Sequence, residues 1–173
     1  MFEIGDYIIY GNNGICSVVE IGPINLGGPM NKDEKLYYTL EPVYEMGSKF
    51  YTPVGNEKVL MRKAMSKEEA LELIENIPDI GFDPDLTDKE REAKIKDALI
   101  KSIDPEEWIK VVKALYYRKE ERKLDGKKMT STDEKFLNEA EEFLFGEIAI
   151  SLDKSREEVE DLVLNRIKEA NIA

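Results

Sequence analysis

The fold is decided at residues 2–21, which read FEIGDYIIYGNNGICSVVEI. Four β-branched or aromatic residues in a row, Tyr7–Tyr10, favour a pleated strand that is buried on both faces. Asn13-Gly14 supplies the positive φ angles that a tight turn between two twisted strands requires, and the apolar run Ile15–Ile21 predicts the returning strand. These residues predict a β-hairpin, which by itself indicates only a small β-module.

Three further segments, Leu36–Leu40, Lys49–Val54 and Val59–Arg62, extend this module with strand-like sequence. Pro53 inside the second segment indicates an edge strand, because proline has no N–H to donate to a neighbour. The connection Gly22–Lys35 is rich in Gly and Pro and a little long for a hairpin loop. Five short strands at this spacing predict a small β-barrel.

From Ser66 onward the apolar residues recur at helical spacing. Helix-capping signals stand at Ser66, Thr87, Asp104, Ser131 and Ser155. Predicted inward faces place Leu71 with Ala70 and Ile74, Ile100 with Ile95 and Leu99, Trp108 with Val112 and Leu115, and Leu162 with Val159 and Val163. The chain is therefore predicted to be α+β, with a small β-barrel over residues 1–64 followed by an all-α helical bundle over residues 65–173.

The composition is that of a globular chain. It has 173 residues, 42% of them hydrophobic and 36% charged, which is enough for one medium domain or two small ones. No apolar run approaches the ~20 residues that span a membrane, and the start MFEIGDY lacks the features of a signal peptide. The single Cys16 excludes an internal disulfide and fits a reducing compartment. We therefore expect a cytoplasmic protein without a membrane partner.

Catalytic readings find little support. The chain has no histidine, which is the commonest general base and metal ligand, and no phosphate-binding GxxxxGK[ST] or GxGxxG motif. Acidic pairs such as Glu141-Glu142 are expected to be solvated faces, and Cys16 is expected to be a small core residue. We predict a protein that is not an enzyme and has no catalytic residue, no cofactor, no metal site and no small-molecule substrate.

The order of residues in the first strands resembles the opening of CarD/CdnL-type bacterial transcription regulators. The resemblance rests on Phe2, Gly5, Asp6, Ile8, Ile9, Tyr10, Gly14 and Ile15, which follow the pattern F-x-x-G-D-x-[IV]-[IV]-Y and then G-[IV]. The Pro-x-His usual in that family is here Gly11-Asn12-Asn13. In the helical half, Val111-Val112-Lys113-x-Leu115 and Phe143–Ala149 are similar to the family patterns V-V-R-x-L and I-L-x-G-E-[IL]-A.

The resemblance implies a fold, a partner and a mechanism. The N-terminal module would be a Tudor/SH3-like barrel, shared with transcription-repair coupling factor, that docks on the RNA polymerase β subunit. The helical bundle would contact promoter DNA upstream of the transcription bubble and stabilise the melted promoter.

The polymerase contact is implied by one strand. The family carries an arginine in a strand that reads [TK]-V-R-V-P, and the corresponding residues here are Lys49-Phe50-Tyr51-Thr52-Pro53. The resemblance therefore assigns the polymerase contact to Lys49, Tyr51, Thr52 and Pro53, with Tyr51 standing near the position of the arginine. Ordinary packing of Tyr51 inside the barrel remains an open alternative.

The DNA contact is the less well matched part. The position of a family tryptophan that wedges into the minor groove falls near Lys89, and the residues that follow match basic positions of the family only at Arg91 and Lys94. A second basic run contains Arg118, Lys119 and Arg122, of which the two arginines share a helical face. The alternative is a solvated helix end with cations near its C-terminus.

Net charge weighs against strong DNA binding. The chain carries a net charge of −12, and residues 66–173, which would face the DNA, hold 19 Lys or Arg against 29 Asp or Glu. A protein held mainly by phosphate contacts has the opposite balance. We therefore expect weak, non-specific DNA contact. Two alternatives remain open: an adaptor that keeps polymerase docking but has lost DNA binding, and a Tudor/SH3-like module for an unrelated peptide or RNA.

Overall fold

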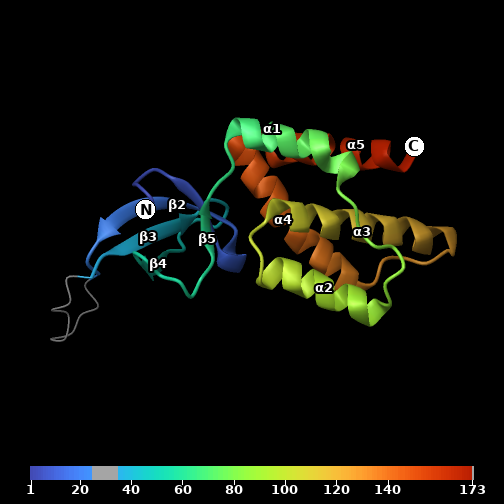
Figure 1. Cartoon of the computed structure of the whole chain (residues 1–173), viewed down its shortest axis with the longest axis horizontal. Coiled ribbons are helices and arrows are strands. Elements are labelled where there is room, and N and C mark those ends of the chain that lie inside the picture. The colour runs from blue at the N-terminus through green and yellow to red at the C-terminus, as the bar shows by residue number, and fades with distance from the viewer. Residues whose placement is uncertain (25–34, 173) are drawn as a thin grey trace. The chain divides into compact units, whose positions relative to one another are not determined.

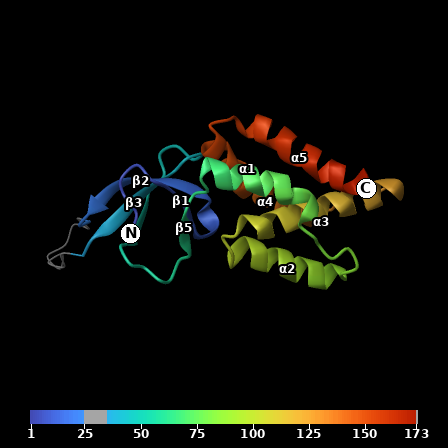
Figure 2. The ribbon, with the colours of Figure 1, turned by 45° about the horizontal axis from the view of Figure 1, so that its top comes forward.

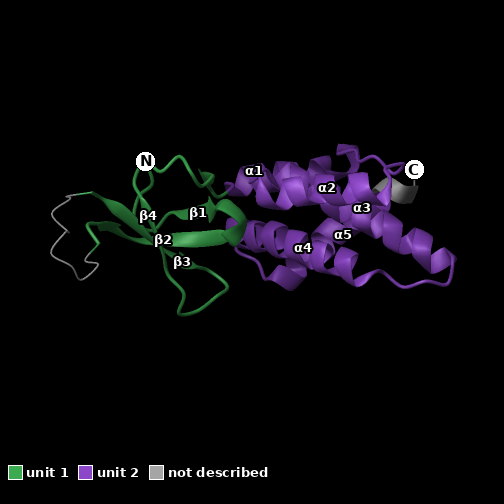
Figure 3. Ribbon diagram, turned by 90° about the horizontal axis from the view of Figure 1, so that it is seen from below, with its two compact units in different colours: residues 1–64 green, residues 65–173 purple. Residues whose placement is uncertain are grey.

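The computed structural model describes residues 1–24 and 35–172. The chain divides into two compact units, residues 1–64 and residues 65–173, which Figure 3 shows in different colours. Most of the predicted connection 22–35 lies outside the described residues.

Unit 1 is a five-stranded antiparallel sheet in the order β4-β3-β2-β1-β5. The strands are β1 (Tyr7–Tyr10), β2 (Ile15–Gly22), β3 (Tyr37–Pro42), β4 (Phe50–Pro53) and β5 (Met61–Lys63). The predicted small β-module is confirmed, but its predicted closure into a barrel is wrong. Among the described residues β4 pairs only with β3 and β5 only with β1. The sheet is therefore open, with these two short strands at its edges.

The hairpin of β1 and β2 forms as predicted, but around a different turn. Gly11–Asn13 form a short 3₁₀ helix, and the positive φ angles fall at Gly11 (51°) and Gly14 (75°) instead of at Asn13. A side chain at Gly11 would also be crowded, since a Cβ there would lie 2.9 Å from Cγ1 of Val59. Both ends of this turn therefore require glycine.

The core of unit 1 lies on the central strands. Ile8, Cys16, Val18, Tyr38 and Leu40 are buried together, and Phe2 and Phe50 pack against them. The fully buried Ile8 and Ile9 confirm that β1 is covered on both faces. The prediction that Cys16 is a core residue is likewise confirmed.

Unit 2 is a bundle of five α-helices: α1 (Lys67–Asn76), α2 (Asp88–Ile100), α3 (Pro105–Leu124), α4 (Ser131–Leu152) and α5 (Arg156–Ile172). Helix α4 contacts each of the other four, and α1 lies beside α5 (Figures 1 and 2). No helix in the described part of the chain is long and apolar enough to cross a membrane.

Four of the five predicted helix starts are confirmed. Ser66 and Thr87 form capping boxes with Glu69 and Glu90, and Asp104 accepts the N–H of Glu106. Ser155 and Glu158 exchange reciprocal hydrogen bonds. The fifth start is wrong by one residue.

Helix α4 is capped by Thr130 and not by Ser131. The Thr130 hydroxyl accepts the N–H of Asp133, and the backbone of Thr130 is extended as a cap requires. Both residues carry a hydroxyl, so the local sequence alone did not distinguish them.

The core of unit 2 contains Trp108, which is 1% exposed. Its ring lies 5.4 Å from that of Phe143, centroid to centroid, which confirms the predicted burial. Three predicted inward residues, Leu71, Ile100 and Leu162, are instead exposed. The neighbouring helices cover only part of each apolar stripe, so tertiary packing decides which of its residues are buried.

Candidate functional site

The edge strand β4 carries the predicted polymerase contacts, and the alternation of a strand divides them between two faces. Tyr51 is 52% exposed, and Lys49 just before the strand is exposed and lies 3.7 Å from a carboxylate oxygen of Glu41. Pro53 is half-buried. Tyr51 is therefore a surface residue, so the alternative of core packing is wrong.

Thr52 points the other way. Its side chain is 1% exposed, and its Oγ1 accepts a hydrogen bond of 2.9 Å from Nδ2 of Asn56. This side chain stabilises the turn that follows β4 and does not reach the surface. A partner at this edge would meet Lys49, Tyr51 and Pro53.

The connection between β3 and β4 exposes two apolar residues that the sequence analysis missed, Tyr44 and Met46. Met46 precedes Gly47, whose φ of 89° marks a turn. The Met46-Gly47 pair was the available sequence signal, since it indicates a turn and turns run over the surface.

In unit 2 two of the predicted DNA-contacting arginines, Arg91 and Arg118, form ion pairs with residues of the same unit. Nη2 of Arg91 and Nη2 of Arg118 lie 3.0 Å and 3.3 Å from the same atom, Oδ1 of Asp88. Nε of Arg118 also donates to Oδ2 of Asp133 at 3.0 Å. Arg118 on α3 therefore joins the first residue of α2 to the first turn of α4.

Asp88 is the centre of this cluster, and it is a residue that the sequence analysis missed. The hydrogen bond from Arg91, and next the charges of Arg118 and Arg91, hold the pKa of its carboxyl below the usual value. The position of Asp88 three residues before Arg91 was the available signal, since that spacing brings two helical side chains together.

The remaining basic residues differ in exposure. Nε of Arg122 donates to the carbonyl of Lys128 at 2.7 Å, so this arginine ties the end of α3 to the following loop. Lys119 is exposed, with its Nζ 5.6 Å from the ring centroid of Tyr116. Lys94 and Lys123 are exposed as well. The arginines therefore support the fold, and the lysines supply the exposed positive charge.

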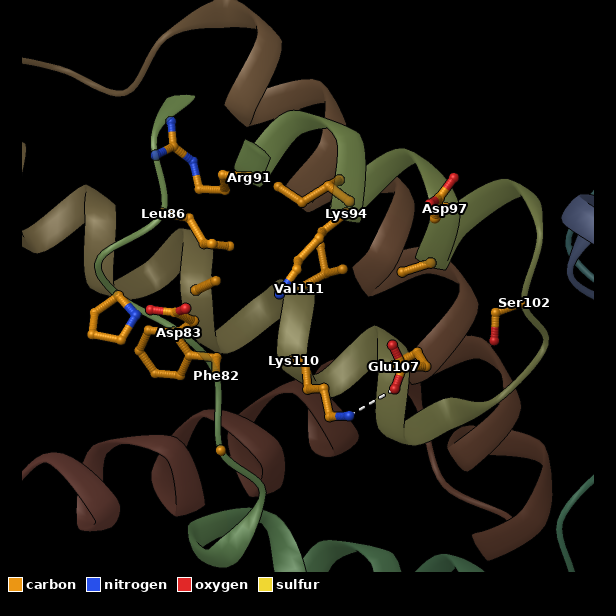
Figure 4. A pocket seen from close by; sticks show the side chains of 15 residues that line it. Phe82, Asp83, Leu86, Arg91, Lys94, Asp97, Ser102, Glu107, Lys110 and Val111 are labelled. Atoms are coloured by element: carbon orange, nitrogen blue, oxygen red, sulfur yellow. Dashed lines mark hydrogen bonds and ion pairs between the residues drawn. The ribbon is translucent and has the colours of Figure 1, made fainter. Parts of the chain in front are cut away.

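A cleft of about 850 Å³ lies between α2, α3 and the segment that precedes α2 (Figure 4). Its apolar lining includes Phe82, Leu86 and Val111, and Arg91 and Lys94 contribute to the wall. The Nζ of Lys110 donates to a Glu107 carboxylate at 2.7 Å, and this hydrogen bond raises the pKa of the lysine. No metal-binding group of three or more His, Cys, Asp or Glu occurs among the described residues.

Comparison with known families assigns both units. Residues 2–65 match the family model described as the CarD-like/TRCF RID domain. Residues 83–164 match the model of the CarD C-terminal domain. The chain belongs to the CarD family. Proteins of the CarD/CdnL type are RNA polymerase-interacting transcription regulators, and their domains are associated with non-enzymatic transcription factors. No curated protein matches the chain significantly.

The two CarD matches divide the candidate residues between them. Lys49, Tyr51 and Pro53 fall in the RID domain, and the arginine cluster around Asp88 falls in the CarD C-terminal domain. Residues 66–82, which include α1, lie between the two matches.

Proposed function

We propose that this CarD-family protein docks on the RNA polymerase β subunit through unit 1 and modulates the stability of the promoter open complex through weak, non-specific DNA contact by unit 2. The observation that carries the proposal is an exposed tyrosine, Tyr51, on the edge strand of a unit that matches the RID domain.

An edge strand suits a protein partner. Its outer backbone groups can pair with a strand of the partner, and tyrosine is one of the side chains that most often anchor an interface. The ion pair of Lys49 with Glu41 joins two half-exposed side chains at 3.7 Å. Such a pair contributes little to stability, so Lys49 is free to exchange its partner on docking.

The weak DNA contact follows from charge and from the position of the tryptophan. Unit 2 has more acids than bases, so its exposed positive charge is local, as at Lys94, Lys119 and Lys123. By the family resemblance the wedge position falls near Lys89, and Trp108 is buried. Docking on polymerase would raise the effective concentration of unit 2 beside DNA, so that a weak contact matters there.

The proposal is tested by binding of the full chain to isolated β subunit. Tyr51→Ala should weaken binding about tenfold or more, the scale of an interface anchor. Tyr7→Ala is a matched control, since Tyr7 is a tyrosine of similar exposure on β1. The proposal fails if wild-type protein does not bind β, or if both variants behave alike.

A second function, a polymerase-binding adaptor without DNA contact, is favoured by one observation. Arg91, Arg118 and Arg122 all have partners inside unit 2. Promoter-complex lifetimes separate the two functions: an adaptor would bind polymerase and leave these lifetimes unchanged.

A further inference from the structure

Two arginines of unit 2 converge on a single exposed carboxylate. The Asp88 side chain is 76% exposed, whereas those of Arg91 and Arg118 are only 14% and 21% exposed. Both guanidinium groups approach Oδ1 of Asp88, at 3.0 Å and 3.3 Å. The carboxylate therefore lies on the outer side of the arginine pair, where an anion from solution would arrive.

A guanidinium pair of this kind matches phosphate as well as it matches carboxylate. Arginine presents planar N–H donors that bind either group, and hydrogen bonds between ionised partners are stronger than neutral ones. An ion pair to an exposed carboxylate adds little to stability, so an incoming phosphate can displace it at small cost. Arg118 would keep its second partner, Asp133, which is nearly buried.

We propose that Asp88 acts as an internal competitor for DNA, occupying the arginine pair Arg91 and Arg118 until a backbone phosphate replaces its carboxylate. This inference rests on the DNA contact of the proposed function and adds Asp88 as a residue that weakens this contact. Asp88 thereby restricts binding of free protein to DNA, while a phosphate held close by the docked polymerase complex can still displace it.

DNA backbone is the occupant that the surrounding charges favour. The exposed Lys94 lies on the same helix as Arg91, and the exposed Lys119 and half-buried Arg122 lie on the same helix as Arg118. Several cations on two neighbouring helices suit a polyanion better than one small anion. Asp83 and Glu121 line a small cavity with the two arginines and limit the attraction that remains after Asp88 is neutralised.

The test compares charge-neutralising variants of the full chain in binding to duplex DNA at several salt concentrations. Asp88→Asn removes the competing charge at nearly constant volume. Glu72→Gln is the control for net charge, because Glu72 is exposed on α1 and has no ion pair within 4 Å in the described part of the chain. A third protein combines Asp88→Asn with Arg91→Gln. Thermal unfolding establishes that all variants are folded.

Asp88→Asn should tighten DNA binding about five- to tenfold at low salt and steepen the dependence of log K on log salt by about 1, as one phosphate contact is gained. Glu72→Gln should change affinity less than about twofold, since a distant charge is screened. Adding Arg91→Gln should remove most of the gain.

The inference is overturned if Asp88→Asn binds DNA no better than Glu72→Gln, or if the gain persists without Arg91. These outcomes are separate from the proposed function, which is judged by binding to β and by promoter-complex lifetimes of the wild-type protein. Wild-type protein that stabilises promoter complexes while Asp88→Asn has no effect would leave the function standing and remove the role of Asp88.

Discussion

The side chain of Glu147 on α4 accepts the backbone N–H of Met65 at 2.8 Å. The hydroxyl of Ser151, one turn later on α4, donates to the carbonyl of the same Met65 at 2.7 Å. Both polar groups of Met65 are therefore held by α4, directly before the Ser66 cap of α1. Glu147 is completely buried, and the two bonds hold the backbone just before α1 against α4.

Replacing Glu147 by alanine should therefore destabilise unit 2. Loss of a buried acceptor leaves the Met65 N–H without this partner, which costs about 1–3 kcal/mol in the free energy of unfolding. Glu142→Ala on the same helix removes an exposed carboxylate and should change stability by less than ~0.5 kcal/mol. Chemical denaturation measures both, and equal effects would contradict the anchoring role of Glu147.

Trp108→Ala should lower the free energy of unfolding by about 3–5 kcal/mol, because it empties a large volume against Phe143. Denaturant titration followed by far-UV circular dichroism measures the loss. Replacing a tryptophan that acts as a DNA wedge would instead change DNA binding and leave stability almost unchanged. A loss below ~1 kcal/mol would contradict the core position.

Cys16 should make stability fall at alkaline pH. Burial, with the charge of Glu45 adding to it, raises the pKa of its thiol from 9.0 to about 12. Between these two values the folded protein keeps a proton that the unfolded chain loses, so the free energy of unfolding decreases as pH rises. Below pH 9.0 Cys16 does not make the free energy of unfolding depend on pH, because the thiol is protonated in both states.

The check for this effect is the free energy of unfolding of wild-type protein and Cys16→Ala at neutral pH and in the alkaline window. Cys16→Ala should lose less stability than wild type between neutral and alkaline pH, because the variant has no thiol that can ionise when the chain unfolds. A thiol reagent should also react slowly with the folded protein and quickly in denaturant. Equal alkaline losses in both proteins would exclude a buried thiol.

The exposed lysines of α3 should contribute to DNA contact on polymerase. Lys119→Glu with Lys123→Glu should shorten promoter-complex lifetimes without weakening β-subunit binding, because the pair faces solvent and lies in the other unit. Lys154→Glu with Lys168→Glu, on the loop before α5 and on α5, changes net charge equally and is the control.

The free protein should bind promoter duplex no better than roughly 10⁻⁴ M at physiological salt, the weak end of non-specific binding. Filter binding or fluorescence anisotropy measures this affinity.

Identical lifetimes for the two double variants would mean that Lys119 and Lys123 are only a solvated helix end.

The amino-acid sequence by itself determined the local features of this protein. The β1–β2 hairpin and the caps at Ser66, Thr87 and Ser155 were predictable, because each depends on residues within about four positions of one another. The burial of Trp108 followed from its helical spacing with Val112 and Leu115. The resemblance at Phe2–Ile15 likewise indicated the family that both family matches support.

Only the tertiary structure decided which of these residues reach the surface. The open edge at β4, the inward side chain of Thr52 and the exposed Tyr51 depend on strand pairing across the sheet. The partners of Arg118, which are Asp88 and Asp133, come from two other helices. Periodicity places an arginine on a face of its own helix, but a distant segment supplies the carboxylate that determines whether the guanidinium remains available for DNA.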